Sequence, residues 1–206
     1  MTILARDTWL AQTKEKALEP DLPVCDPHHH FWDYPGNRYL VDEFLQDVSG
    51  GHRLISTVFV ECLQFYRSEG TAELRPVGET EFIDGIAGVY QTPHGPTHVG
   101  AGIIGFADLT LGTAVQPILE AHLVASNRFR GVRYASAWDA SDLVHNAHTK
   151  PPRYVLAGTQ FREGLACLER MDLSFDAWLY HPQLGELVQL ARAFPGLTIV
   201  LDHMAG

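Results

Sequence analysis

The chain alternates between short apolar runs rich in β-branched residues and longer segments whose apolar residues recur every three or four positions. The apolar runs, which we expect to be strands, lie at residues 22–25, 54–61, 99–106, 129–134, 173–181 and 197–203. The segments with helical periodicity lie between them, at residues 79–90, 113–125, 159–171 and 183–194. Strands that alternate with helices of this length form βαβ units around a parallel sheet. The pattern therefore predicts an α/β fold, and the nearly continuous apolar character of the runs agrees with strands buried on both faces.

The composition of the 206 residues argues against several classes of protein. Hydrophobic residues make up 46% of the chain, which is enough for a buried core and is not typical of a disordered protein. The formal net charge is −10, from 25 acidic and 15 basic residues, so neither a nucleic-acid groove nor a basic membrane-binding surface is expected. No apolar run reaches the roughly 18 residues that span a bilayer, and the charged N-terminal segment does not resemble a signal peptide.

Cysteine and histidine are used very differently in this chain. The three cysteines, Cys25, Cys62 and Cys167, are far apart and form neither a disulfide framework nor a zinc knuckle. This usage is typical of a reducing compartment, and we expect a cytoplasmic location. The eleven histidines are more informative, because histidine is the usual acid–base group near neutral pH and the commonest metal ligand.

The most specific local signal is a tract of three adjacent histidines, within residues 26–30, directly after the first expected strand. In extended backbone, residues two apart point to the same side, so the side chains of His28 and His30 should converge. This is the arrangement that a metal ion or a polarised carbonyl group requires, although such tracts also occur on protein surfaces. His145 and His148 lie in a long polar segment, and we expect them to be solvated.

Polar side chains also stand at the ends of later expected strands, at Glu61, Arg133, His181 and His203. The carboxyl ends of parallel strands meet at one edge of a sheet, and α/β barrels build their active sites there. Each of these residues taken alone could be a buried polar group with a structural partner, but several in register favour a site. Tyr180 and His181 should point to opposite faces of a strand, and we expect His181 to face the site.

Four short motifs together resemble the amidohydrolase superfamily. They are Asp26-x-His28-x-His30-Phe31-Trp32, Phe59-Val60-Glu61, Arg130-Gly131-Val132-Arg133-Tyr134 and Val200-Leu201-Asp202-His203-Met204. The closer resemblance is to the amidohydrolase 2 branch, which includes 2-pyrone-4,6-dicarboxylate hydrolase and lactonases such as L-fuconolactonase. It covers residues 23–206, with 1–22 as an N-terminal extension, and implies a distorted (β/α)8 TIM barrel. Because such a barrel typically has about 250 residues and only six strands are expected here, we predict a barrel truncated after about six strands.

The resemblance also implies site residues. His28 and His30 match the histidine pair after the first barrel strand, His203 matches the histidine of strand six, and His181 is a weaker match to that of strand five. The superfamily's metal-bridging lysine has no counterpart, because Arg133 stands at that strand end, so a binuclear metal centre is not expected. Members of this branch bind one divalent ion or none, which leaves open the choice between no cofactor and one zinc or manganese ion. No residue of the chain matches the family's catalytic aspartate of strand eight.

Hydrolysis of a lactone requires a positioned water, a base and positive charge that faces the developing oxyanion. The residues predicted to be catalytic are His28, His30, Arg133, His181 and His203. If a metal is bound, its predicted ligands are His28, His30 and His203.

The predicted substrate-binding residues are Arg133, Glu61 and Tyr180. The planar guanidinium of Arg133 suits a substrate carboxylate, because the two groups form paired hydrogen bonds. Glu61 would either orient a histidine or line the pocket, and a solvated strand-end carboxylate is the alternative. Tyr180 would line the pocket.

The leading functional prediction is a hydrolase that opens a lactone bearing a carboxylate, with that small molecule as its binding partner. A mononuclear metal-dependent amidohydrolase or a nonoxidative decarboxylase is the second hypothesis. The third is an inactive truncated barrel or a binding module, since an open barrel would expose apolar strand edges. Assembly into a homo-oligomer is left open by the sequence.

Overall fold

The computed structural model describes residues 8–9, 11–13, 15–141, 143–144 and 150–205 of the chain. His145, His148 and part of the expected N-terminal extension lie outside the described residues. Among the helices that the structure describes, none combines the length and apolar character needed to cross a membrane.

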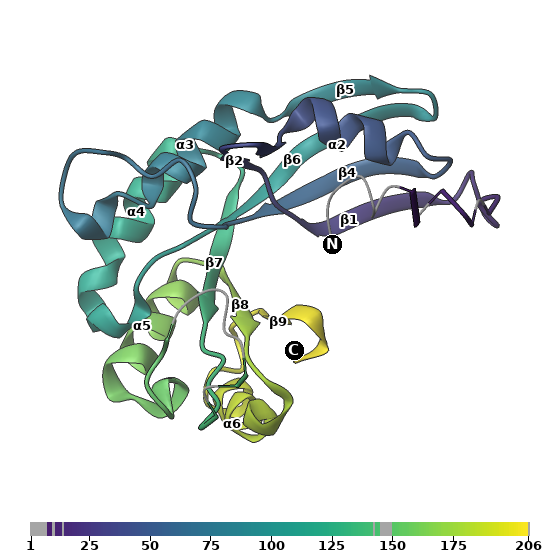
Figure 1. Cartoon of the computed structure of the whole chain (residues 1–206). Helices are drawn as coiled ribbons and strands as arrows, with labels where there is room; N and C mark the ends of the chain where they lie inside the picture. Colours follow the sequence, from purple (N-terminus) through teal and green to yellow (C-terminus); the bar gives the residue numbers. More distant parts are fainter. Residues whose placement is uncertain (1–7, 10, 14, 142, 145–149, 206) are drawn as a thin grey trace.

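The centre of the fold is a curled sheet of parallel strands that forms about half of a barrel (Figure 1). Each strand pairs in parallel with its neighbour, as the sequence pattern predicts. The strand order is β1 (Pro23–His29), β4 (Arg53–Val60), β6 (Gly95–Gly105), β7 (Phe129–Ala135), β8 (Ser174–Trp178) and β9 (Ile199–Leu201). The predicted α/β fold with about six parallel barrel strands is therefore confirmed.

Helices fill the connections between consecutive parallel strands. They are α2 (Val41–Val48), α3 (Val77–Ile86), α4 (Gln116–Ala125), α5 (Thr159–Arg170) and α6 (Leu184–Ala193). Short 3-10 turns complete the connections: η1 (Ala72–Leu74), η2 (Leu109–Val115), η3 (Val155–Ala157), η4 (His181–Gln183) and η5 (Asp202–Met204). A small antiparallel hairpin, β2 (Trp32–Tyr34) with β3 (Asn37–Tyr39), follows β1.

Two apolar clusters attach the helices to one face of the sheet. One includes Phe59 of β4 and Phe44 of α2, and the other includes Val132 of β7 and Phe175 of β8 with residues of α4, α5 and α6. We call the opposite face of the sheet the inner face. Because side chains alternate along a strand, the neighbours of these apolar residues point to the inner face.

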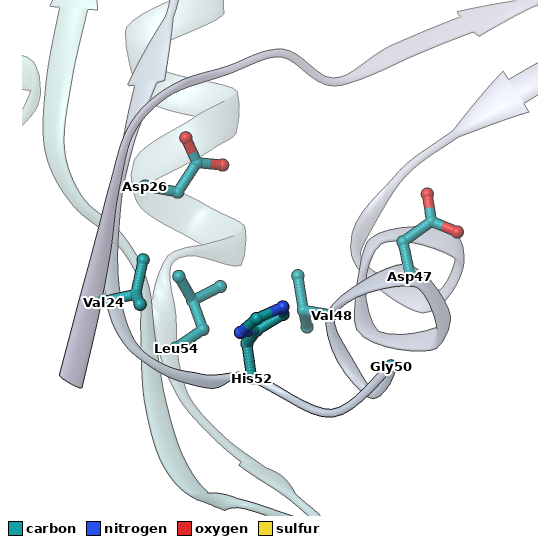
Figure 2. Close-up of a pocket in the computed structure, with 7 residues that line it drawn as sticks. All are labelled: Val24, Asp26, Asp47, Val48, Gly50, His52 and Leu54. Carbon is teal, nitrogen blue, oxygen red and sulfur yellow. The ribbon is translucent and has the colours of Figure 1, made fainter. Parts of the chain in front are cut away.

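A bulge in β1 decides which histidines reach the inner face. Asp26 faces α2, where it lines a cavity with residues of that helix (Figure 2), and the His29 ring also packs against α2, at 4.8 Å between its centroid and that of Phe44. In a regular strand, residues three apart would face opposite ways. The pairing with β4 shifts register between Asp26 and His29, and Pro27 in this stretch has no N–H for the ladder. The backbone N–H of His28 donates instead to the Asp26 carboxylate, at 3.1 Å.

The prediction of a helix at residues 79–90 is wrong at its C-terminal end. The helix α3 stops at Ile86, and β5 (Gly88–Thr92) pairs antiparallel with the start of β6. Two residues connect the strands, and the hydroxyl of Thr92 donates to the carbonyl oxygen of Gly95 across the turn, at 2.8 Å. The β-branched residues and the turn residues Pro93 to Gly95 favour this hairpin over another helical turn.

Two strands that were expected to include the polar residues at their C-terminal ends are shorter than predicted. Instead of residues 173–181 and 197–203, β8 ends at Trp178 and β9 at Leu201. After β8 the chain enters the 3-10 turn η4 at His181, and after β9 it takes left-handed backbone at His203, with φ of 50°. The polar residues therefore lie on turns beyond the strands, where neighbouring residues no longer alternate between the two faces.

Candidate functional site

The side chains of His28 and His30 meet on the inner face at the end of β1. Their Nε2 atoms are 3.2 Å apart, and the two rings are perpendicular with centroids 4.8 Å apart. The two side chains converge because they are two apart in extended backbone, and the β1 bulge turns them away from α2 while His29 stays packed on that helix.

The protonation state of His30 follows from its second ring nitrogen. Its Nδ1 lies 2.7 Å from the carbonyl oxygen of Val60, and a carbonyl oxygen can only accept a hydrogen bond. His30 therefore carries its hydrogen on Nδ1, and the lone pair of its Nε2 faces His28. Burial, assisted by the charge of Arg133, lowers the pKa of His30 to about 3, so this ring is neutral near pH 7.

His28 contacts two residues that follow β9. Its Nδ1 lies 3.5 Å from the carboxylate of the buried Asp202, and its ring is 4.6 Å from that of His203 between centroids. Partial burial and the neighbouring His28 lower the pKa of His203. The structure thus brings three of the four predicted site histidines together and adds Asp202. The only signal for Asp202 in the sequence was its position directly before His203.

The donor pair fits two ligand positions of one divalent ion. When two imidazole nitrogens each lie about 2.1 Å from an ion, tetrahedral or octahedral geometry separates them by about 3.0–3.4 Å. The separation of 3.2 Å between His28 and His30 falls in this range, and the lone pair of His30 points into the gap. Asp202 behind His28 matches the carboxylate that commonly orients a metal-binding histidine. Within the described ranges, no group of three histidine, cysteine, aspartate or glutamate residues is arranged to hold an ion.

Arg133 and Glu61 form a buried ion pair across the sheet. The Nε of Arg133 donates to Oε1 of Glu61 at 2.9 Å, and its Nη2 donates to the backbone carbonyl oxygen of Glu61. The side chains are 4% and 0% exposed, and β6 lies between β4, which Glu61 directly follows, and β7, which carries Arg133. Glu61 thus contacts Arg133, and its role in orienting a histidine stays a prediction. The role of Arg133 in binding a substrate carboxylate stays a prediction.

Asp176 is an inner-face carboxyl group that the sequence interpretation missed. It lies on β8 directly beside Arg133 in the strand register, and it is 4% exposed. Burial, followed by the nearby charge of Asp202, raises the pKa of Asp176 to about 7. The signal in the sequence was a carboxylate in the middle of an otherwise apolar strand, where charged residues are rare unless paired.

His181, the fourth predicted site histidine, lies on the turn that follows β8. His181 is exposed and begins the 3-10 turn η4, whereas Tyr180 is half-buried. The backbone N–H of Tyr180 donates to Oε1 of Gln183 at 3.2 Å, which fixes the chain just beyond β8. The catalytic role of His181 and the substrate-binding role of Tyr180 stay predictions.

A separate cavity of about 310 Å³ lies between β1, β4 and α2, on the helix side of the sheet (Figure 2). It is lined by Val24, Asp26, Asp47, Val48, Gly50, His52 and Leu54. Both of its carboxylates accept hydrogen bonds from the protein itself. Asp26 accepts from the backbone of His28, and Asp47 accepts from the hydroxyl of Tyr39 at 2.7 Å. This cavity does not include the histidine pair.

Two comparisons of the sequence with known proteins give matches over most of the chain. Residues 25–206 match the family model described as amidohydrolase (Amidohydro_2). The chain is also 29% identical over 205 residues to the uncharacterised protein y4mH of Sinorhizobium fredii. That match covers 89% of this chain and 62% of y4mH.

Three solved proteins share the fold. Amidohydrolase 2 from Bifidobacterium longum subsp. infantis has a TM-score of 0.56 at 18% identity, over 89% of this chain and 62% of its own. An amidohydrolase from Burkholderia multivorans, solved with bound HEPES and with bound zinc, gives TM-scores of 0.58 and 0.55 at 19% and 20% identity. Both matches cover 88% of this chain and 57% of that protein.

The third is a probable 2-pyrone-4,6-dicarboxylic acid hydrolase from Acinetobacter baumannii with citric acid bound. Its TM-score is 0.53 at 14% identity, over 88% of this chain and 58% of its own. The chain thus spans 57–62% of the length of the relatives it matches. At these identities the structural likeness shows the fold alone.

Proposed function

Because the chain belongs to the amidohydrolase family, we propose that it is a hydrolase that opens a lactone bearing a carboxylate by attack of water. The observation that carries this proposal is the convergence of His28 and His30 at the inner-face end of β1. The proposed substrate and reaction belong to the whole protein, since the chain spans less than two thirds of its relatives.

The tautomer of His30 favours one of two uses of the histidine pair. A ring that polarises a carbonyl group directly must donate a hydrogen bond to it. His30 has its only N–H committed to Val60, so the nitrogen that faces the site is an acceptor. A neutral imidazole with an available lone pair is instead the form that binds metal ions. This favours a metal-dependent reaction over direct activation by His30.

We therefore propose that His28 and His30 hold one divalent ion, zinc or manganese. Such an ion would act as a Lewis acid on the ester carbonyl and lower the pKa of a bound water. Asp202 would orient His28 through its Nδ1, from which it lies 3.5 Å away. The Burkholderia multivorans protein, solved with bound zinc, supports this assignment by analogy of fold.

Two further inner-face residues have proposed roles. Arg133 supplies positive charge that reaches the histidines, since it contributes to the lowered pKa values of both His30 and His203. That charge would attract a substrate carboxylate, and Tyr180 would line the same space. Asp176, buried beside Arg133 on the inner face, would exchange the proton of the attacking water. The neighbour described as a probable hydrolase of a pyrone dicarboxylate is consistent with an acidic substrate.

The test is hydrolysis of defined lactones by protein loaded with zinc or manganese. We expect turnover of 2-pyrone-4,6-dicarboxylate, measured as acid release, and much less with the neutral lactones L-fuconolactone and γ-butyrolactone. His28→Asn and His30→Asn should each reduce turnover by about 100-fold or more, because each removes a proposed ligand. His98→Asn, which changes an exposed histidine of β6, is the matched control.

Two results would reject this proposal. One is full activity in the His28→Asn and His30→Asn variants. The other is the absence of any lactone hydrolysis by folded, metal-loaded protein. An amide substrate assayed in parallel distinguishes the lactonase from an amidohydrolase that uses the same histidine pair.

A further inference from the structure

Glu79 is a buried carboxyl group that none of the proposed catalytic steps uses. It lies in the first turn of α3 and is 1% exposed. Its Oε1 accepts two backbone hydrogen bonds, from the N–H of Cys62 at 2.9 Å and from the N–H of Gln64 at 3.0 Å. Both amides belong to the turn that follows β4, so one side chain of α3 holds this turn.

The turn that Glu79 holds has an unusual backbone. Leu63 and Phe65 have φ values of 63° and 56°, in the left-handed region that residues other than glycine rarely adopt. They alternate with the two residues whose amides bind Glu79. Backbone that alternates in this way forms a concave nest of N–H groups, which favours an oxygen at its centre. The Oε1 atom of Glu79 occupies that position.

The helix α3 is packed closely enough to place the carboxyl group there. A Cβ atom at Gly78 would lie 2.5 Å from the backbone nitrogen of Arg67 and 2.7 Å from the carbonyl oxygen of Phe65. Only glycine therefore permits this approach of the helix to the turn. The ring of Phe65 stacks on that of Phe82 of α3, with centroids 3.7 Å apart.

The turn connects directly to the candidate site at its N-terminal end. Glu61, which precedes it, binds Arg133 through its carboxylate and through its backbone carbonyl oxygen. The thiol of Cys62 donates to the carbonyl oxygen of Phe31, which directly follows His30, at 3.1 Å. A shift of this turn would therefore move the acceptors of Arg133.

We propose that Glu79 is a positioning residue for the candidate site: by holding the amides of Cys62 and Gln64, it fixes the turn that orients Glu61 and, through it, Arg133. The candidate site rests on the proposed function, whereas the positioning of Arg133 can be measured without any substrate.

The charge state of Glu79 sets the choice of variant. Burial, followed by the nearby Glu61, raises the pKa of Glu79 to about 8, so the carboxyl group is neutral at pH 7. The titratable groups that face it are Glu61 and Cys62 at the end of β4 and Tyr66 in the turn. Burial raises the pKa values of Cys62 and Tyr66 as well, which keeps both uncharged. Glutamine is therefore a close mimic of the native group.

The experiment compares Glu79→Gln with Glu79→Ala by NMR of the whole chain. The readouts are the Nε–H signal of Arg133 and the hydrogen-exchange protection of the Cys62 and Gln64 amides. We expect Glu79→Ala to lose about tenfold or more of this protection and to broaden or shift the Arg133 signal. Glu79→Gln should retain both, because it keeps the acceptor oxygen. Glu73→Ala, which removes an exposed carboxylate of the 3-10 turn η1, is the control.

A pH titration adds a second readout that simple packing would not move. In the wild-type protein, the Cys62 and Gln64 amide shifts should titrate together above pH 7, and in Glu79→Gln this titration should be absent. The proposal is overturned if folded Glu79→Ala keeps the Arg133 signal, or if Glu79→Gln loses it. If Glu79→Ala does not fold, the glutamine variant and the titration decide. A failure of lactone hydrolysis with these NMR results intact would reject the proposed function alone.

Discussion

His30 donates its Nδ1–H to the backbone carbonyl oxygen of Val60 at 2.7 Å, and this bond turns the lone pair of its Nε2 toward His28. His30 directly follows β1, and Val60 is the last residue of β4, the strand that pairs with β1. The backbone of one strand end thus selects the tautomer of a side chain on its neighbour. A hydrogen bond of this kind commonly determines which histidine nitrogen can bind a metal ion.

Removal of the Asp202 carboxylate should weaken metal binding. Asp202→Asn is expected to reduce zinc affinity by about 10–100-fold, because the residue behind a ligand fixes its ring orientation and raises its basicity. Calorimetric titration of the metal-free protein with zinc measures the change. Asp33→Asn, at an exposed position of the β2–β3 hairpin, should leave the affinity unchanged. Equal affinity in wild type and Asp202→Asn would remove Asp202 from the site.

The Arg133–Glu61 pair should be strongly coupled in stability. Arg133→Met leaves a buried carboxylate without its cation and is expected to lower the free energy of unfolding by about 3–5 kcal/mol. The double variant Glu61→Met with Arg133→Met should lose less than the two single changes added together. Urea denaturation of the four proteins measures the coupling. Strict additivity would contradict the buried ion pair.

Asp176 should make stability fall as the pH rises. Its pKa is raised from 3.8 to about 7 in the folded protein, so the folded state retains a proton that the unfolded state has lost. The stability present at low pH is therefore lost between about pH 4 and pH 7, by on the order of 4 kcal/mol. Asp176→Asn cannot ionise and should remove this loss. Denaturation of both proteins at pH 5 and pH 8 checks the sign. If the stability that Asp176→Asn gains over the wild-type protein is no larger at pH 8 than at pH 5, this expectation is wrong.

Two glycines of α3 should respond oppositely to alanine. At Gly78 a Cβ would collide with the backbone of Arg67 and Phe65, so Gly78→Ala should destabilise the protein by about 1–3 kcal/mol. At the exposed Gly85 no heavy atom lies within 4 Å of the added carbon, and Gly85→Ala should stabilise the helix by up to about 1 kcal/mol. Thermal unfolding of the pair tests this. Similar effects at both positions would show that α3 does not pack against the turn as described.

The sequence predicted the sheet well because periodicity is a local property. Apolar runs with β-branched residues mark β4 and β7 nearly to their ends, and the helical period marks α5 and α6. The same reasoning failed at residues 88–92, where a helical pattern continued through Gly88 into a strand. The segment becomes a strand because it pairs with β6, and the pattern of residues along one segment contains no information about such pairing.

The candidate site was predictable only in part. The spacing of His28 and His30 indicated that they converge, but the bulge that separates them from Asp26 arises from pairing with β4. Tertiary folding also brought two polar strand ends together, since the ring of His203 lies against that of His28. Asp176 and Glu79 were missed because burial, not residue type, gives them their raised pKa values.

The sequence by itself determined the class of fold, the order of its strands and helices, and the presence of polar residues beyond the strand ends. These follow from side-chain periodicity and backbone preferences, which act between residues close in the chain. The tertiary structure alone decided the pairing of Arg133 with Glu61, the tautomer of His30 and the burial of Glu79 in the turn after β4. Those features depend on contacts between residues 17 to 72 positions apart, and such contacts form only when the sheet curls and the helices pack against it.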